Sequence, residues 1–366
     1  MKTIGIFTSN YGHESIANAI AEKIEKEAKG KYRIKLFFRK PVLEFAYNSF
    51  YRLSPSSFVY SYRLASDIMS NRSGKKIIDS WLSLSDKKEI GDFIKKNKVD
   101  LSINTFFLCN PTLEKFQKKG IPLINVLTDP KTIHPLVFSH AAKVNFAFDN
   151  YVAKHYKNKN VKQSGWFVRP QFESDYDKSK IRKKLKLDDS LTFLISSGSE
   201  GANSVLKILP SIINCNKKVN FIIACGKNKF LYNNTLGIKQ SLNSLSSSKA
   251  KIIPLGYTKD LHLYMQAADM VIGKAGPNTV FESIACETAF FAITHIHGQE
   301  DGNLDIIRDY KIGIVEENTK KANQELEKLI KNPEKIDSFT KNIKKLKEYN
   351  KNSINILLEE IDKLLN

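Results

Sequence analysis

The chain has 366 residues, 42% of them hydrophobic and 26% charged, which is typical of a soluble globular protein with room for two domains. Its 58 basic and 38 acidic side chains leave a formal net charge of +20, which favours an anionic partner such as a nucleotide-bearing substrate or a lipid surface. Several classes are disfavoured: four scattered cysteines suggest neither disulfides nor zinc, no stretch approaches the ~18 apolar residues of a membrane span, and no nucleic-acid-binding motif occurs. Polar residues break the first apolar run too early for a signal peptide, so we expect a cytoplasmic protein.

Strand and helix patterns alternate along the chain, which predicts an α/β protein with mainly parallel sheets. The first half contains a predicted amphipathic helix over residues 14–29 that stops at Gly30. Its predicted strands lie near residues 3–8, 32–38, 99–104, 121–127 and 144–148. A polar run over 173–190 precedes a second set of strands, near residues 192–196, 219–225, 251–255, 270–272, 290–294 and 312–315. The lysine-rich end, 320–366, predicts helices, and the whole pattern predicts two α/β units in tandem.

One segment breaks this alternation. Residues 45–62 contain seven aromatic side chains, and basic residues outnumber acidic ones across 39–76. Aromatic rings interleaved with cations are typical of a bilayer interface, although a buried helix hairpin would show the same periodicity. The candidate acceptor and membrane contacts in this segment are Phe50, Tyr51, Arg52, Phe58, Tyr62 and Arg63.

The stretch 273–283 has the layout of a phosphate-binding turn, because an apolar strand leads through glycines directly into a helix. Gly276 lets the backbone approach a ligand, Pro277 suits the first helical position, and the amides of Asn278 and Thr279 belong to the open first turn. Glu282 falls on the same helical face as Thr279, where its carboxylate can bind both hydroxyls of a ribose.

A second polar cluster, residues 297–303, follows the next predicted strand and opens another helix. Loops that leave neighbouring strands of a parallel sheet meet in the crevice where such sheets bind ligands. Gln299, Glu300 and Asn303 have the amide and carboxylate groups that pair with sugar hydroxyls, although Glu300 and Asp301 would also serve as helix caps.

Together these motifs resemble glycosyltransferase family 28, in particular its branch of monogalactosyldiacylglycerol synthases and processive diacylglycerol glucosyltransferases. The two strongest motifs are KAGPNTVFES, residues 274–283, and HGQEDGN, residues 297–303. Supporting motifs, in the order of the family, are LTDPKTIHP, GWFVRP, SSGSEGAN and ACGKN. One such motif would be weak, but this many in order make coincidence implausible.

The resemblance implies a GT-B architecture, in which two Rossmann-like domains face each other across a cleft. Residues 1–168 would form the acceptor and membrane-binding domain, and residues 169–340 the UDP-sugar domain. The helix over 341–366 would pack back on the first domain. The aromatic segment occupies the place of the family's membrane-contacting insertion, so we expect peripheral association with the inner face of an anionic membrane.

The resemblance also implies a donor site that needs neither a metal nor another cofactor. Helix N-termini would stabilise the diphosphate, with Gly198 and Gly201 of a glycine-rich loop assisting the turn at Gly276. Tyr257 occupies the place where the family's backbone touches uracil. His295 and His297 lie near this loop, but the sequence suggests no third ligand for a metal.

His13 is the candidate catalytic base, because it follows the first strand and its ordinary pKa suits proton abstraction near neutrality. Asp129 is a candidate to orient or assist it, and His134 to line the acceptor entrance, although both would also fit turns and caps. The sequence departs from the family here: SNYGH stands where the family has GGGH, which places the acceptor's identity in question.

The expected function is therefore an inverting, metal-independent transfer of a hexose from a UDP-sugar to a membrane lipid, with diacylglycerol the first choice. Three alternatives remain: transfer of N-acetylglucosamine to a polyprenyl-linked peptidoglycan precursor, a UDP-sugar 2-epimerase, and a catalytically silent UDP-sugar-binding protein. Nucleic acid is not an expected partner. The sequence does not choose among galactose, glucose and N-acetylglucosamine.

Overall fold

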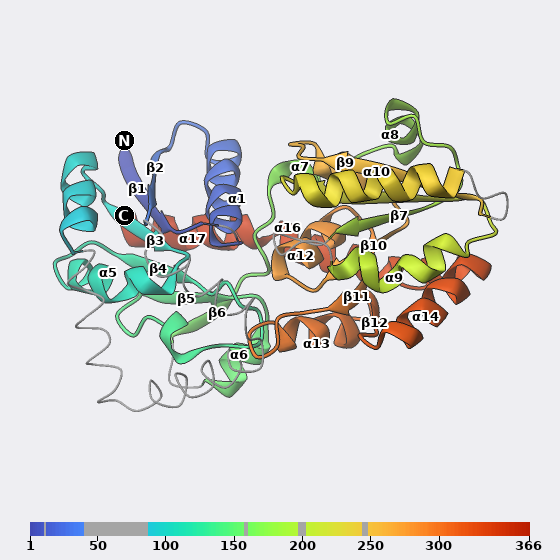
Figure 1. The fold of residues 1–366 in the computed structure, drawn as a ribbon. Helices are drawn as coiled ribbons and strands as arrows, with labels where there is room; N and C mark the ends of the chain where they lie inside the picture. The colour runs from blue at the N-terminus through green and yellow to red at the C-terminus, as the bar shows by residue number, and fades with distance from the viewer. Residues whose placement is uncertain (11, 40–86, 157–159, 197–202, 244–247) are drawn as a thin grey trace. The chain divides into compact units, whose positions relative to one another are not determined.

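The computed structural model describes residues 1–10, 12–39, 87–156, 160–196, 203–243 and 248–366 (Figure 1). The chain divides into two compact units. Unit 1 comprises Met1–Pro170, His297–Gly302 and Tyr349–Asn366. Unit 2 comprises Gln171–Ile296 and Asn303–Glu348.

Unit 1 is built on a six-stranded parallel sheet with the order β2-β1-β3-β4-β5-β6. Every residue of β3, β4 and β5 is buried, as expected for parallel strands covered on both faces. The strands are β1 (Lys2–Thr8), β2 (Tyr32–Phe38), β3 (Leu101–Asn104), β4 (Leu123–Val126), β5 (Val144–Ala147) and β6 (Val161–Gln163). The short polar strand β6 was not predicted from the sequence.

Two helices from opposite ends of the sequence pack together in unit 1. Helix α1 (Gly12–Glu27) buries Ile16, Ile20 and Ile24, and Gly30 ends its last turn with a φ of +77°. Helix α17 (Ser353–Leu365) contacts α1 and β3. The shorter helices of this unit include residues 87–97, α5 (Asn110–Gln117) and α6 (Asn150–His155). Two 3-10 helices, η1 and η2, span Phe107–Cys109 and Pro135–Val137.

Gly165 of the GWFVRP motif has a φ of +79°, a conformation that suits glycine. A Cβ atom there would also lie 3.1 Å from the Cα atom of Asn350. The Asn350 side chain in turn accepts a hydrogen bond from the Trp166 N–H at 3.0 Å. The motif thus holds the last segment of the chain within unit 1.

Unit 2 is built on a second six-stranded parallel sheet, with the order β12-β11-β10-β7-β8-β9. Its strands are β7 (Leu191–Ser196), β8 (Val219–Gly226), β9 (Ala250–Gly256), β10 (Met270–Lys274), β11 (Ala289–Thr294) and β12 (Gly313–Val315). Its helices are α7 (Pro170–Glu173), α8 (Lys178–Lys184), α9 (Asn203–Ile213), α10 (Lys229–Asn243), α11 (Leu261–Ala267), α12 (Pro277–Ala285), α13 (Asp301–Asp309), α14 (Thr319–Lys331), α15 (Glu334–Asp337) and α16 (Thr340–Lys351), of which α7, α13 and α16 cross a unit boundary.

Both sheets reverse their winding direction beside their first strand, between β1 and β3 in unit 1 and between β7 and β10 in unit 2. Ligands of such sheets bind beyond the carboxyl ends of the strands at this switch point. The α/β class predicted from the alternation is confirmed. Among the residues that the structure describes, no helix has both the length and the apolar character needed to cross a membrane.

Candidate functional site

His13 lies at the switch point of unit 1, in the first turn of α1. Its Nδ1 atom is 2.8 Å from the carbonyl oxygen of Thr105, which follows β3 directly. Because a carbonyl can only accept, Nδ1 carries the proton and the lone pair of the neutral ring resides on Nε2. The ring also packs edge-on against Phe106, with centroids 4.9 Å apart.

Burial lowers the pKa of His13 to about 4, and the hydrogen bond to the Thr105 carbonyl opposes that change only in part. The imidazole is therefore neutral at neutral pH. A neutral ring with a fixed tautomer and a lone pair on Nε2 has the properties of a general base.

Asp129 lies beside the loop His297–Gly302, which belongs to the same unit. Burial, together with the nearby Glu300 carboxylate, raises the pKa of Asp129 to about 7, although a hydrogen bond from Gln299 acts in the opposite direction. The Gly302 N–H donates to Thr132 Oγ1 at 2.7 Å, which joins the two segments. The structure thus groups Asp129 with two candidate sugar ligands, while the Thr105 carbonyl is the group that orients His13.

His134 caps the short helix η2. Its Nδ1 accepts a hydrogen bond from the Leu136 N–H at 3.2 Å, and burial lowers the pKa of the ring to about 4. The cap explains why a histidine stands here, and its place at the acceptor entrance stays a prediction.

In unit 2, β10 leads through a short turn into α12. Gly276 is the residue before the helix, with extended backbone at φ −68° and ψ 138°, and Pro277 occupies the first helical position. Asn278, Thr279 and Glu282 are half-buried on one side of the helix, whereas its opposite side packs into the core. The first turn of α12 and the Glu282 side chain therefore lie on the side of the helix that faces away from the core of unit 2.

Gly273, the first glycine of this stretch, is required by the packing of two strands. It is a residue of β10, and a Cβ atom there would lie 1.9 Å from the carbonyl oxygen of Ser196 in β7. The close approach of these strands places the start of α12 beside the end of β7.

Asn303 holds the turn before α12, and its expected contact with sugar hydroxyls stays a prediction. Its side chain is 3% exposed, and Nδ2 donates to the Ala275 carbonyl at 2.7 Å. Asp301, weighed as a helix cap, accepts a hydrogen bond from the N–H of Gly298, three residues before it.

Tyr257 follows β9 and is 63% exposed, with the Lys227 ammonium group 5.0 Å from its ring centroid. Both residues lie beyond the carboxyl ends of neighbouring strands, where an exposed ring and a cation suit a base and a phosphate.

Sequence reasoning missed a hydrogen-bonded histidine and glutamate pair at the carboxyl edge of the same sheet. His295 Nδ1 lies 2.7 Å from Glu317 Oε1, and the half-buried Lys207 ammonium donates to the Ile293 carbonyl at 2.6 Å. Burial lowers the pKa of Lys207.

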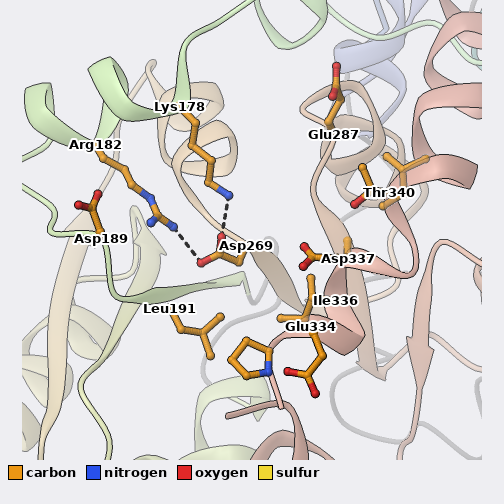
Figure 2. A pocket seen from close by; sticks show the side chains of 13 residues that line it. Lys178, Arg182, Asp189, Leu191, Asp269, Glu287, Glu334, Ile336, Asp337 and Thr340 are labelled. Carbon is orange, nitrogen blue, oxygen red and sulfur yellow. Dashed lines mark hydrogen bonds and ion pairs between the residues drawn. The ribbon is translucent and has the colours of Figure 1, made fainter. Parts of the chain in front are cut away.

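A charged cavity of about 440 Å³ lies at the opposite, amino edge of the unit 2 sheet (Figure 2). Its floor includes the first residues of β7 and β11, and Asp269 there pairs with Lys178 at 2.7 Å and Arg182 at 2.8 Å. The cavity shares no residue with the candidate donor set.

Several candidate residues lie outside the residues that the structure describes. They are Gly198 and Gly201 of the glycine-rich loop and the acceptor or membrane candidates Phe50, Tyr51, Arg52, Phe58, Tyr62 and Arg63. Their roles stay predictions.

Comparison with protein families gives two matches on separate parts of the chain. Residues 192–357 match the glycosyltransferase family 28 C-terminal domain, and residues 13–168 match monogalactosyldiacylglycerol (MGDG) synthase. The resemblance stated from the motifs is confirmed.

The similar proteins of known function include diacylglycerol glucosyltransferases and monogalactosyldiacylglycerol synthases. A processive diacylglycerol beta-glucosyltransferase of Bacillus pumilus is 26% identical over 371 residues, which cover 98% of this chain and 94% of the relative. Monogalactosyldiacylglycerol synthase 3 of Arabidopsis thaliana is 28% identical over 255 residues, which cover 65% of this chain and 50% of that one.

Solved structures show the fold. MurG of Acinetobacter baumannii has a TM-score of 0.65 at 17% identity, with 99% of this chain and 100% of that chain covered. The UDP-GlcNAc 2-epimerase of Neisseria meningitidis, bound to UDP-GlcNAc, has a TM-score of 0.62 at 15% identity and the same coverage. The chain has the GT-B fold that its motifs implied.

Proposed function

The chain belongs to the glycosyltransferases with a family 28 C-terminal domain, and on that premise we propose that it transfers a hexose from a UDP-sugar to a diacylglycerol-type membrane lipid. The transfer proceeds with inversion at the anomeric carbon and without a metal ion. The chain binds the membrane from its cytoplasmic side, through the segment 45–63.

The observation that carries this proposal is the hydrogen bond between His13 Nδ1 and the Thr105 carbonyl. With Nδ1 committed to that bond, Nε2 takes the proton of the lipid hydroxyl as that oxygen attacks the anomeric carbon. The low pKa of the buried ring keeps this nitrogen unprotonated at neutral pH. An attack opposite the leaving group inverts the configuration, so an α-linked donor gives a β-glycoside.

On the donor side, the amides at the start of α12 face the diphosphate, and the Glu282 carboxylate accepts hydrogen bonds from the ribose hydroxyls. The positive end of the helix stabilises the negative charge that grows on the leaving UDP. This arrangement replaces the role that a divalent cation has in metal-dependent transferases.

The choice of acceptor is supported by the names of the relatives, which act on diacylglycerol or make galactosyldiacylglycerol. The net charge of +20 and the aromatic segment favour an anionic membrane surface.

The test incubates the purified chain with UDP-glucose, UDP-galactose or UDP-GlcNAc and with vesicles that contain diacylglycerol. We expect a glycosyl-diacylglycerol by mass spectrometry, β-linked by NMR, and the same yield after EDTA treatment. A loss of transfer after EDTA treatment would contradict the metal-free mechanism. Conversion of UDP-GlcNAc without lipid would support an epimerase, and sugar transfer only to a polyprenyl-linked acceptor would support the peptidoglycan alternative.

A further inference from the structure

Three buried asparagines stand side by side on neighbouring strands of unit 1. Asn104 on β3 pairs in register with Asn125 on β4, which pairs with Asn145 on β5. Each is at most 1% exposed. Asparagine is depleted in strands and is seldom buried, so three in register call for a physical reason.

The three amide groups bond to one another in a row. Asn104 Nδ2 donates to Asn125 Oδ1 at 3.3 Å, and Asn125 Nδ2 donates to Asn145 Oδ1 at 2.8 Å. We call this row the asparagine ladder.

The ladder also forms hydrogen bonds with the backbone of residues 137–139, a few residues after His134. Asn125 Nδ2 donates to the Val137 carbonyl at 2.7 Å, and Asn145 Nδ2 donates to the Ser139 carbonyl at 3.0 Å. Asn145 Oδ1 accepts from the Ser139 N–H at 3.0 Å. Both N–H groups of Asn125 are thus used, so this buried side chain has no spare donor.

The other end of the ladder reaches the neighbourhood of His13. Asn104 Nδ2 also donates to Asn110 Oδ1 at 2.7 Å, and Asn104 Oδ1 accepts from the Phe106 N–H at 3.2 Å. The residue between Asn104 and Phe106 is Thr105, whose carbonyl holds the His13 ring. One buried network therefore fixes both the backbone that orients His13 and the backbone that follows Asp129 and His134.

We propose that the asparagine ladder sets the position of the acceptor segment 129–139 relative to His13, with Asn125 as its central positioning residue. This inference rests on the proposed function and on the predicted place of His134 at the acceptor entrance. An apolar contact has no direction and tolerates sliding, whereas a fully paired amide network holds one geometry. A shift of the segment by a fraction of an ångström would misplace the lipid hydroxyl against His13 Nε2.

The test compares Asn125→Ala with Asn220→Ala. Asn220 is a matched control, since it is a buried asparagine on strand β8 of unit 2 whose Nδ2 donates to Asp188 and Thr192. Both variants should lose thermal stability, but only Asn125→Ala should lower kcat/KM for the lipid acceptor, by about tenfold or more. UDP affinity should stay unchanged in both, and amide exchange of residues 136–139 should accelerate only in Asn125→Ala.

Should Asn125→Ala fail to fold, Asn125→Thr tests the same point, because it is neutral, suits a strand and keeps only one of the two donors. Equal losses of activity in the unit 1 variant and the Asn220→Ala control, or unchanged exchange of residues 136–139, would overturn the ladder's positioning role. If the unsubstituted chain transfers no sugar to lipid, the proposed function is contradicted. The positioning role of the ladder would still be tested, because amide exchange is measured without turnover.

Discussion

His13 donates its Nδ1 proton to the carbonyl oxygen of Thr105 across 2.8 Å, and this bond joins the first turn of α1 to the end of β3. A backbone carbonyl does not ionise, so it fixes the tautomer at every pH at which the ring is neutral. It thereby performs the orienting task that a carboxylate has in many histidine-dependent sites.

Replacing His13 by Asn should abolish most of the transfer while leaving the fold intact. The Asn amide can still donate to the Thr105 carbonyl, but it has no basic nitrogen. We expect kcat to fall by a factor on the order of 10²–10⁴. Calorimetry with UDP serves as the control, because the donor residues are not changed. Retention of near-normal turnover would assign the base to another residue.

Asp129→Asn should change how stability depends on pH. The folded-state pKa of Asp129 is raised to about 7 from an ordinary value of 3.8, so the folded chain binds more protons than the unfolded chain between these values. The contribution of Asp129 to stability is therefore present below pH 3.8 and is lost as the pH rises to 7. The variant should melt at a higher temperature than the unsubstituted chain at pH 8, with the difference shrinking toward pH 4. A pH-independent difference in melting temperature would show that Asp129 ionises normally.

Glu282→Ala should weaken UDP binding by about 1.5 to 3 kcal/mol, the value of hydrogen bonds to a charged group. Glu282→Gln keeps one carbonyl acceptor at the same place and should lose less. Isothermal titration with UDP measures both, and circular dichroism checks the fold. Equal affinity in all three proteins would remove Glu282 from the donor site.

Gly273→Ala should destabilise unit 2 severely, because the new Cβ atom would lie 1.9 Å from the Ser196 carbonyl oxygen. We expect a loss of about 3 kcal/mol or more in the free energy of unfolding, at the upper end for overpacked cores. The control is Gly237→Ala in α10, where a Cβ atom meets nothing within 4 Å. That change should stabilise the helix by up to about 1 kcal/mol. Similar urea midpoints for the two variants would mean that β7 and β10 separate readily.

Phe50 and Tyr51 carry a prediction that comes from the sequence alone. If their segment contacts a bilayer, replacing both by serine should reduce binding to anionic vesicles and lipid glycosylation together, while UDP affinity stays the same. Binding of the unsubstituted chain should weaken with salt, since each nearby cation contributes about 1 kcal/mol that screening removes. Full vesicle binding by the double variant would indicate core packing instead.

The strands with long apolar runs could be predicted from the sequence, because parallel strands that are covered on both faces consist mostly of apolar residues. It missed β6, since three residues with two polar side chains do not stand out from a loop. The turn before α12 was predicted from Gly276 and Pro277, whose preferences are local. The packing roles of Asn303 and Gly273 could not be predicted, because each depends on a residue that is distant in the sequence. Asn303 bonds to Ala275, and Gly273 packs against Ser196. The asparagine ladder could not be predicted either, because it depends on the register between neighbouring strands, which tertiary packing sets.

The division of the chain has a consequence for its synthesis. Unit 2 is complete once Glu348 has been made, whereas unit 1 still awaits Tyr349–Asn366. Until α17 has been made, the surface of α1 that it contacts stays exposed to solvent. The side chains that complete this part of the unit 1 core, Ile354, Leu357 and Ile361, all belong to α17. The order of folding on the ribosome therefore runs against the order of the sequence, because the domain that starts first finishes last. Released chains that end at Glu348 should contain a protease-resistant unit 2 and a protease-sensitive unit 1.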